Sequence, residues 1–400
     1  MSEPLWGVRV RCSALERALL RTPQLRRLHY VAWAGAARFA TQQVPTRLQH
    51  VCGAFALAAT FAPDRPDVRA AALLHDVGHP PFSHALEAIA EVDHHRATAE
   101  RIRAAPVADL LRDAGLDPER VLALAEGEEP SAFKNRDGRL HLDHLDSLVR
   151  AAAAGGGLTV APARLLAGAS LDAEAGDGSQ LVFDDATADL LETLIVREAH
   201  AHVSAADLGA SAMLAALVQV LRLADLVRVD ELPYLTDADL IASLTAADAT
   251  RAEARRLLLR PWGVRVRKLE EGAPLPDGTI LARKERFYLD LPRRRGEREG
   301  DRSARERALE ERLGELRGRY AVDWDPDDRE GAFATSGPTG TPWTAALGSV
   351  LSDAPDVPDA PELATERRAQ PRPGDDRPGA AEGSDAGAGS DAGAGNGSAG

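Results

Sequence analysis

Cysteines are rare in this chain of 400 residues, which contains only Cys12 and Cys52. Two thiols exclude a framework of several disulfides and a zinc site built from cysteines, so a reducing cytoplasm is the expected location. The opening residues, MSEPLWGVRV, lack a basic region followed by an apolar one, so they do not predict a secretory signal peptide. We find no apolar run of the length expected of a transmembrane helix, and we therefore expect no membrane partner.

Aromatic residues are also few, at 4%, and positive charge is outweighed, with a formal net charge of −14. A chain with this balance does not attract a free polyanion such as DNA, although a local basic pocket can still bind phosphate. Hydrophobic residues reach 44% and are dominated by Ala and Leu, which favours helices packed on helices. We therefore expect a mainly α protein with a substantial core, and we do not expect nucleic acid as a partner.

Capping residues and apolar spacing predict a series of helices. Ser13 and Glu16 have the spacing of a capping box, and Thr22-Pro23 is typical of a helix start. Asp93 is expected to cap a helix that begins with His94 and His95. Further helices are predicted over Arg47–Phe61, Asp67–Asp76, His141–Ala153, Ala186–Val203 and Ser204–Arg228.

The apolar period then changes from helical to alternating. Strands are predicted over Val264–Lys268, Thr279–Arg283 and Arg286–Leu291, around a turn at residues 276–278. Ser303 is expected to cap a charged helix whose apolar stripe is Leu309, Leu313, Leu316 and Tyr320. From about Pro326 onward the periodicity fades, and the end is rich in Gly, Ala, Ser and Asp, which predicts a disordered tail.

These patterns divide the chain into three parts. Residues 1–155 are expected to form a helical core with a short strand at the start. Residues 156–325 are expected to form a helical extension that carries a small β insertion near 262–292. Residues 326–400 are the predicted disordered, low-complexity tail.

The most informative segment runs from Ala71 to Glu87, AALLHDVGHPPFSHALE. His75 and Asp76 end an apolar run that reads as a buried helix, and His79, His84 and Glu87 follow closely. Imidazole and carboxylate groups are the ligands that hold Zn, Mn, Fe and similar divalent ions. An Asp at the end of a core helix is costly unless a partner or a metal neutralises it. The segment therefore predicts half of a metal site.

Three other places can complete that site. Arg47 and His50 are three residues apart on one predicted helix and therefore share a face. His94 follows a predicted helix cap, where an imidazole can reach a phosphate. In the third place an acid, a hydroxyl and an arginine fall at i, i+4 and i+7 of one helix, which packing alone does not explain; they are Asp143, Ser147 and Arg150.

Each feature has a structural alternative when taken alone. A single His such as His50 is usually a satisfied core residue, His94-His95 is most often a surface pair after a cap, and Arg150 is usually a solvated helix end. The chain has 11 histidines, however, and five of them fall in just these segments: His50, His75, His79, His84 and His94. The agreement of spacing and context favours a functional site.

These motifs resemble the HD-domain metal-dependent phosphohydrolases, and most of all the branch of deoxynucleoside triphosphate triphosphohydrolases and the SAM-and-HD-domain protein. The resemblance covers about the first 155 residues. It is carried by Glu3-Pro4-Leu5-Trp6-Gly7, Leu15 to Leu28, Thr46-Arg47-Leu48-Gln49-His50, His75 to His84, and Leu142-Asp143-His144-Leu145-Asp146.

The resemblance implies a helical HD-domain bundle and an enzyme that uses a divalent metal ion, with Mn, Fe, Zn and Mg all open. It makes His50, His75, Asp76 and Asp143 the metal ligands. It makes His79, His84, Glu87 and His94 the catalytic group, and it places Arg47 and the residues at His144, Ser147 and Arg150 on the substrate side. Cationic Arg47 and His79 would stabilise phosphate charge, and protonated His84 would donate to the leaving oxygen. Relatives of this branch often assemble through flanking helices, which implies a homo-oligomer.

The chain departs from this branch where the branch reads its substrate. A phosphate-contacting Lys is replaced by His144, a sugar-stacking Tyr by Ser147, a final Asp by Ala151 and a deoxyribose-contacting Gln by Trp33. A regulatory nucleotide site is also altered, with Arg21, Arg26 and His29 at the aligned positions. Hydrolysis of a phosphoester or phosphoanhydride is therefore predicted, with a nucleotide as the favoured substrate and without deoxynucleotide specificity.

Two other functions stay open on the sequence. One is a regulatory module that binds a nucleotide or a metal without turnover, which the changes at Ser147 and Ala151 motivate. The other is a helical scaffold with an acidic tail. Phosphate release and metal content distinguish the three.

Overall fold

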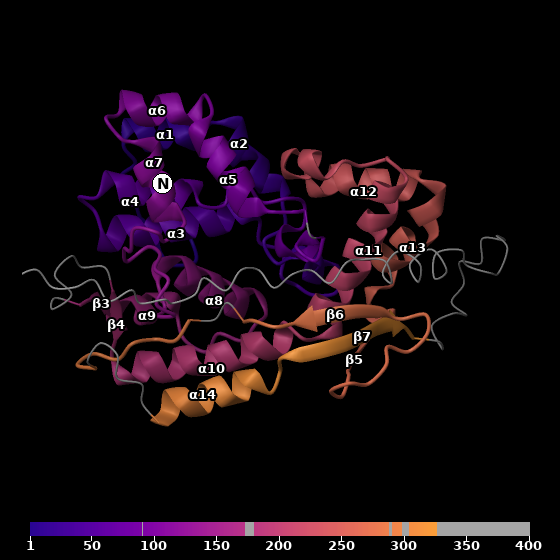
Figure 1. The fold of residues 1–400 in the computed structure, drawn as a ribbon. Coiled ribbons are helices and arrows are strands. Elements are labelled where there is room, and N and C mark those ends of the chain that lie inside the picture. Colours follow the sequence, from indigo (N-terminus) through magenta and orange to yellow (C-terminus); the bar gives the residue numbers. More distant parts are fainter. Residues whose placement is uncertain (90, 173–179, 288–289, 298–303, 326–400) are drawn as a thin grey trace, which may run out of the picture. The chain divides into compact units, whose positions relative to one another are not determined.

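The computed structural model describes residues 1–89, 91–172, 180–287, 290–297 and 304–325. The predicted disordered tail lies outside the described residues, as does Ser303, the expected cap of the last helix. The described part is mainly helical with small antiparallel sheets, as predicted (Figure 1).

Helix α3 (Arg47–Phe61) is the central element of the N-terminal bundle and begins and ends where the sequence predicted. Thr46 and Gln49 form its capping box, and most of its side chains are buried, including Val51, Phe55 and Leu57. It contacts α4 (Pro66–Leu74) on one side and α8 (Leu142–Ala154) on another, and α7 (Pro118–Ala125) packs on α4. Because α3, α4 and α8 meet in this way, the polar residues near their ends are brought together.

The other predicted helix starts of the N-terminal part are confirmed. Ser13 and Glu16 form the capping box of α1 (Ala14–Leu19), and Thr22 caps α2 (Pro23–Arg27). Asp93 caps α5 (His94–Arg103) by accepting a hydrogen bond from the Arg96 amide. Between α5 and α7 lies α6 (Val107–Asp113), and short 3₁₀ turns cover Leu28–Tyr30, Gly35–Phe39 and Ser83–Leu86.

The C-terminal helices of the described part are α9 (Pro162–Gly168), α10 (Asp185–Ala201), α11 (Ala210–Leu223), α12 (Asp237–Ala246), α13 (Asp248–Leu259) and α14 (Ala304–Gly314). Two further 3₁₀ turns cover Val229–Tyr234 and Pro261–Gly263. The helix α14 lies beside α10, and α11, α12 and α13 pack on one another (Figure 1).

The predicted helix over 204–228 is shorter and has an irregular start. Ala205–Gly209 form a π-helical turn before α11. A Cβ at Gly209 would lie 2.7 Å from Val264 Cγ1, so only glycine lets this turn pack directly on the neighbouring strand. The stretch 205–223 also corrects the expectation that no run reaches membrane length, because its 19 residues have a mean hydropathy of 1.4. Its inner face is buried in the protein core, with Met213, Leu217 and Leu221 almost inaccessible.

The β insertion is a three-stranded antiparallel sheet in the order β5–β7–β6. Strands β5 (Val264–Lys268) and β6 (Ile280–Lys284) agree with the prediction, and β7 (Gly318–Trp324) lies between them. Two-stranded ladders join β1 (Ser2–Glu3) to β2 (Val8–Arg9) and β3 (Ala169–Leu171) to β4 (Leu181–Phe183).

The third strand is where the prediction was wrong. Residues 286, 287 and 290 are not in a strand, and Leu291 makes only an isolated bridge to Arg139. The apolar stripe of the last helix is also shorter than predicted, because α14 ends at Gly314 and Tyr320 belongs to β7. The alternating apolar residues around Tyr320 and Val322 belong to the sheet, and both side chains are buried against apolar residues of α11, α12 and α13.

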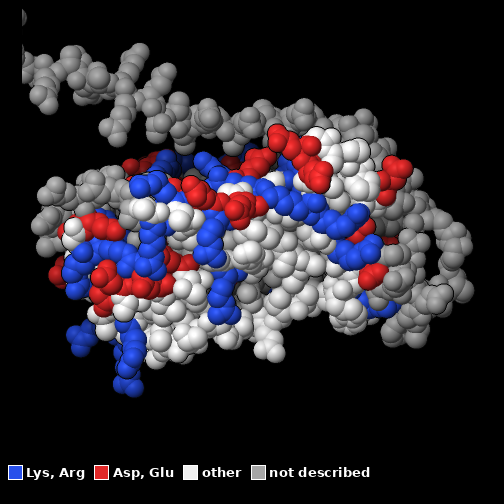
Figure 2. Space-filling view, turned by 90° about the horizontal axis from the view of Figure 1, so that it is seen from below, with Lys and Arg blue, Asp and Glu red and all other residues white. Residues whose placement is uncertain are grey.

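Two clusters of buried apolar side chains hold the described residues together. The first joins α3, α4 and α8 to α10 and α14, so the helices after residue 156 help to bury the N-terminal bundle. The second joins α11, α12 and α13 to the sheet and also contains Phe82 and Leu86, which follow α4 in the chain. The division at residue 155 stays a prediction. On the face shown in Figure 2, blue and red side chains are interspersed and form no single basic patch.

Candidate active site

The sequence-predicted metal ligands meet at one buried point. His50 comes from α3, His75 and Asp76 directly follow α4, and Asp143 lies in the first turn of α8. We call these four residues the His–Asp cluster. His50 Nε2 lies 3.3 Å from His75 Nε2 and 3.1 Å from Asp143 Oδ1, and His75 Nε2 lies 3.3 Å from Asp76 Oδ1. The side chains are between 1% and 8% exposed, so the cluster is shielded from water.

Hydrogen bonds on the far side of each ring fix the tautomers of the two histidines. His50 Nδ1 lies 2.8 Å from the Asp146 carboxylate, and His75 Nδ1 lies 3.0 Å from the carbonyl oxygen of Ala72. Both partners only accept hydrogen bonds, so each Nδ1 carries the proton and donates it. When the rings are neutral, each Nε2 therefore turns a lone pair toward the centre of the cluster, as in metal-bound histidines.

The electrostatics of the cluster call for a positive charge. Burial raises the pKa of Asp76, but the neighbouring His75 and the charge of Arg47 outweigh it and hold that pKa well below its usual value. The pKa of Asp143 is also held well below its usual value, because the neighbouring His75 and Lys134 outweigh the effect of burial, which raises it. For His50, burial lowers the pKa, but hydrogen bonds to Asp143 and Asp146 raise it to about 9. A proton on His50 is thus what the carboxylates recruit when no metal ion is present.

A divalent cation fits this donor set. Two ligand atoms at about 2.1 Å from one ion lie roughly 3.0 to 3.4 Å apart at angles between square and tetrahedral. The Nε2 and carboxylate atoms of the His–Asp cluster lie 3.1 to 3.6 Å apart, and those of His50, His75 and Asp76 all fall within 4.8 Å of one another. Two imidazoles and two carboxylates also leave positions free for water and a phosphate oxygen.

A second layer of residues holds the cluster, and the sequence did not predict this supporting role for any of them. Asp146 accepts hydrogen bonds from His50 Nδ1, from Trp6 Nε1 at 2.7 Å and from Arg150 Nε at 2.8 Å. Arg150 also binds Glu3, 3.1 Å away. A Cβ at Gly53 would lie 2.0 Å from Asp146 Oδ1, so only glycine at this point of α3 leaves space for the Asp146 and Arg150 side chains.

The expected substrate-binding role of Arg150 is therefore corrected. Its guanidinium is buried and occupied by Asp146 and Glu3. The sequence signal was present, because Asp146 and Arg150 are four residues apart on α8 and hence neighbours on the helix surface. Their burial, which makes them a support for His50, appears only in the folded chain.

Arg47 lies beside the cluster, as predicted, and its guanidinium is already engaged. It donates to Asp76 Oδ2 at 2.9 Å, to Ser83 Oγ at 3.1 Å and to the carbonyl oxygen of Trp33 at 3.0 Å. Arg47 therefore orients Asp76 and fixes the segment around Ser83, and its charge reaches the space in front of the cluster. The Trp33 ring itself lies 6.2 Å from that of His50, centre to centre.

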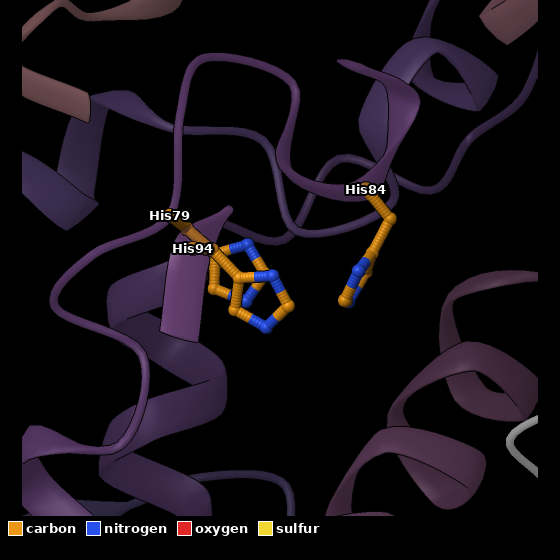
Figure 3. Close-up of side chains that lie close together, drawn as sticks. All are labelled: His79, His84 and His94. Carbon is orange, nitrogen blue, oxygen red and sulfur yellow. The ribbon is translucent and has the colours of Figure 1, made fainter. Parts of the chain in front are cut away.

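Three further histidines form a second group next to the first, and we call His79, His84, His94 and Glu87 the histidine group. The rings of His79 and His94 stack with their centres 4.2 Å apart, and His84 approaches from the opposite side (Figure 3). Glu87 Oε1 lies 2.7 Å from His84 Nδ1 and 2.8 Å from His94 Nδ1. One carboxylate thus orients two imidazoles, and the pKa of Glu87 lies well below its usual value because both histidines outweigh the effect of burial.

His79 links the two groups. Its Nε2 lies 3.2 Å from Asp76 Oδ1, whereas its Nδ1 is buried without a hydrogen-bond partner among the described residues. Burial first, and then the charges of Arg47 and His94, lower the pKa of His79 well below its usual value. This shift disfavours the cationic form that the resemblance implied for His79.

The segment that carries these histidines is held in a strained shape from two sides. Phe82 and Ser83 have φ angles of 55° and 51°, which side chains rarely adopt. Asp237, at the start of α12, accepts hydrogen bonds from the Phe82 amide and the Ala32 amide, both at 2.8 Å. Arg27 donates to the carbonyl oxygens of Val77 and His79. Neither Asp237 nor Arg27 carries a sequence signal, because both contacts span the tertiary structure.

The last predicted residues lie on α8. His144 is a quarter exposed and directly follows Asp143, and Ser147 is half-buried one turn later. Two residues that were not predicted complete this corner: His141, the cap of α8, and Asp290, which lies within hydrogen-bond distance of both histidines. Lys134 was also missed, and its Nζ lies 3.5 Å from Asp143 Oδ2.

Comparison with known proteins identifies the domain. The family profile of the HD domain matches residues 47–148, about a quarter of the chain. No match was found among curated proteins. Solved structures with a similar fold include a phosphohydrolase from Bacteroides thetaiotaomicron, with 18% identity, a TM-score of 0.50, and coverage of 67% of this chain and 78% of that one. Another is a hypothetical protein from Aquifex aeolicus, with 18% identity, a TM-score of 0.56, and coverage of 88% and 99%.

Residues 47–148 therefore match the HD-domain family, and their His–Asp cluster is the candidate metal site. The matched segment contains every predicted metal ligand and the whole histidine group.

Proposed function

We propose that this HD-domain phosphohydrolase hydrolyses a phosphoester or phosphoanhydride bond of a nucleotide and that it needs a divalent metal ion held by His50, His75, Asp76 and Asp143. The observation that carries the proposal is the set of lone pairs that converge from both Nε2 atoms and both carboxylates, with tautomers fixed by Asp146 and Ala72. Such a set is stable only around a cation. A cytoplasmic homo-oligomer is the form of the enzyme that we propose.

When bound, the ion supplies a Lewis acid for a phosphate oxygen and a water of lowered pKa. The chain's own groups do the rest of the work. Arg47 holds Asp76 in place through its hydrogen bond of 2.9 Å and adds a fixed positive charge beside the phosphate position. Because this charge and the surrounding dipoles are already oriented, no reorganisation is needed when charge develops during the reaction.

The histidine group is arranged to move a proton. Because Glu87 binds the Nδ1 of His84, the Nε2 of His84 is the ring nitrogen that remains for a ligand. The His84 side chain is 54% exposed and therefore reachable by a substrate. A protonated His84 can donate from Nε2 to the leaving oxygen, while Glu87 stabilises the ring's charge. His94, held by the same carboxylate oxygen, and His79 line the other side of the same space (Figure 3).

The nucleotide part of the proposal rests on the resemblance of the first 155 residues and on the charge pattern. Arg47 and Lys134 place two positive charges beside the His–Asp cluster in a protein whose net charge is −14, and together with a bound cation they would favour a polyanionic group at this point. The residues at Ser147 and Trp33 differ from those with which the resembling branch reads a deoxyribose, and we therefore do not propose specificity for deoxynucleotides.

The test is product analysis over a panel of ribonucleotides, deoxynucleotides and simple phosphoesters with Mn²⁺, Fe²⁺, Zn²⁺ or Mg²⁺. Release of phosphate, pyrophosphate or triphosphate is expected for at least one combination of compound and metal ion. His75→Ala and Asp143→Ala should abolish this release. His200→Ala is the matched control, because His200 is an exposed histidine of α10. Thermal stabilisation by a nucleotide with no product in any combination would instead favour a regulatory binding module. Turnover that survives in metal-stripped Asp143→Ala would contradict the proposed mechanism.

A further inference from the structure

A second group of metal-ligating side chains adjoins Asp143 in the chain, and of its members only His144 has been given a role so far. His141 and His144 flank Asp143 in the chain, and their rings lie 4.2 Å apart, centre to centre. Asp290 reaches them from the segment that follows β6. Its Oδ2 lies 2.6 Å from His144 Nδ1 and 3.2 Å from His141 Nε2. The three ligand atoms fall within 4.8 Å of one another, so this group needs an explanation.

The proton positions distinguish a hydrogen-bonded group from a metal site. As the cap of α8, His141 Nδ1 accepts the hydrogen bond of the His144 amide, which leaves the proton of the neutral ring on Nε2. A carboxylate oxygen only accepts, so both His141 Nε2 and His144 Nδ1 donate to Asp290. A nitrogen that carries a proton is not a metal ligand, and this arrangement therefore favours a carboxylate that holds two imidazoles.

The same bonds single out one free atom. With Nδ1 bound to Asp290, the remaining ring nitrogen of His144 is Nε2. His144 is 25% exposed and Asp290 is 21% exposed, whereas His141 is 2% exposed, so His144 is the member of this group that a ligand can reach. His144 also directly follows the proposed metal ligand Asp143 on α8.

We propose that Asp290 is a positioning residue that sets His144 Nε2 against a phosphate group of the substrate. This rests on the proposed function, and it assigns part of the substrate side of the HD domain to a residue some 140 positions further along the chain. A protonated imidazole donates to a phosphate oxygen through Nε2, and the Asp290 carboxylate balances the ring's charge through Nδ1. The buried His141 fixes the Asp290 carboxylate from the other side and holds the orientation in place.

A double-mutant cycle tests this assignment with the substrate found in the panel and with the metal-loaded full chain. Asp290→Asn should raise KM about tenfold with little change in kcat, the effect expected for one charge-assisted hydrogen bond. His144→Ala should do the same, and adding Asp290→Asn to His144→Ala should change KM no further. In His144→Lys, whose point charge needs no orienting partner, Asp290→Asn should also be without effect.

Asp323→Asn is the matched control. Asp323 is similarly exposed, at 18%, and is paired with Arg265 on the sheet. It should leave KM unchanged. If Asp290→Asn raises KM equally in the native and His144→Ala backgrounds, Asp290 acts independently of His144 and the assignment is wrong. If the native protein holds two ions per chain and Asp290→Asn holds one, the group is a metal site and the assignment is likewise overturned.

Failure of this inference is separable from failure of the proposed function. If the native protein turns over no compound in the panel, the cycle is repeated with inorganic phosphate as the ligand, measured by calorimetry. Asp290→Asn should then weaken phosphate binding about tenfold in the native background and not in His144→Ala. Equal binding by the native protein and Asp290→Asn would overturn the role of Asp290.

Discussion

The His–Asp cluster and the substrate side next to it are built in different ways. The four cluster side chains are between 1% and 8% exposed, and their supports, Asp146, Arg150, Trp6 and Glu3, all lie in the first 150 residues. Around the substrate side, His84 is 54% exposed and His144 is 25% exposed. Glu87 supports it from nearby, and two further supports come from much later in the chain, with Asp237 behind the Phe82 segment and Asp290 behind His144.

This difference follows from what each region has to do. A cluster of two carboxylates and two imidazoles keeps its geometry only where every outer hydrogen bond is made and water is excluded. A substrate, in contrast, must enter and leave, so the groups that contact it need a free face and a support from behind. The same carboxylate chemistry thus serves two purposes: Asp146 locks a closed site, and Glu87 and Asp290 orient rings at an open one.

Removing a cluster ligand is expected to have the largest effect. His75→Ala should abolish turnover, a loss of at least about a thousandfold, because the several kcal/mol of charge stabilisation that the ion supplies are lost. Metal analysis of the purified variant should show that the ion is absent, and the apparent melting temperature should no longer rise with added metal. A His75→Ala protein that keeps its metal and its activity would show that the cluster is not the metal site.

On the open side, His84→Gln should lower kcat by about a hundredfold to a thousandfold, the range for loss of a positioned general acid. Metal content and stability should stay unchanged, because the His84 side chain is half exposed and binds no cluster residue. Steady-state kinetics on a substrate with a good leaving group provides a sharper measurement. Such a substrate needs little protonation, so the loss should shrink, and an equal loss on both substrates would argue against proton donation by His84.

Weakening the support of the closed site should have an intermediate effect. Asp146→Asn keeps the shape but removes the charge that holds His50 Nδ1 and Arg150, and it should lower metal affinity about tenfold to a hundredfold. Titration of the metal-free native and Asp146→Asn proteins with metal measures the two affinities. High metal concentration should restore most of the activity of Asp146→Asn, whereas it should not restore His75→Ala.

The long-range support of the open side should give the smallest change in activity. Asp237→Asn weakens the acceptor that holds the Phe82 and Ala32 amides, and it should lower the free energy of unfolding by about 1–3 kcal/mol, with less than about a tenfold loss of turnover. Chemical denaturation measures the free energy of unfolding, and steady-state kinetics measures kcat. Asp239→Asn, a change in the exposed capping box of the same helix, is the matched control and should leave kcat unaffected. An equal loss of kcat in both variants would place the effect in α12 itself.

The sequence determined the closed half of this site. The His–Asp pair after an apolar run predicted half of a metal site, and the resemblance of the motifs to the HD-domain phosphohydrolases implied the four ligands. Helix periodicity and capping, which are local properties, predicted the helices that carry them. The third strand of the sheet was missed for the converse reason. Alternation around Tyr320 is ambiguous until β5 and β6 offer it a ladder on both sides.

Only the tertiary structure decided which polar residues face the substrate and which support the cluster. Arg150 and Asp143 are equally plausible ligand-facing residues on α8, and burial against Glu3 and Asp146 makes Arg150 a support instead. Asp237 and Asp290 have no local signal at all, because their partners lie some 150 residues away and a hydrogen bond across that distance leaves no periodic trace in the sequence. The types of the ligand residues are therefore apparent from local sequence motifs, whereas the orientation of the groups around the proposed substrate site depends on packing between distant segments.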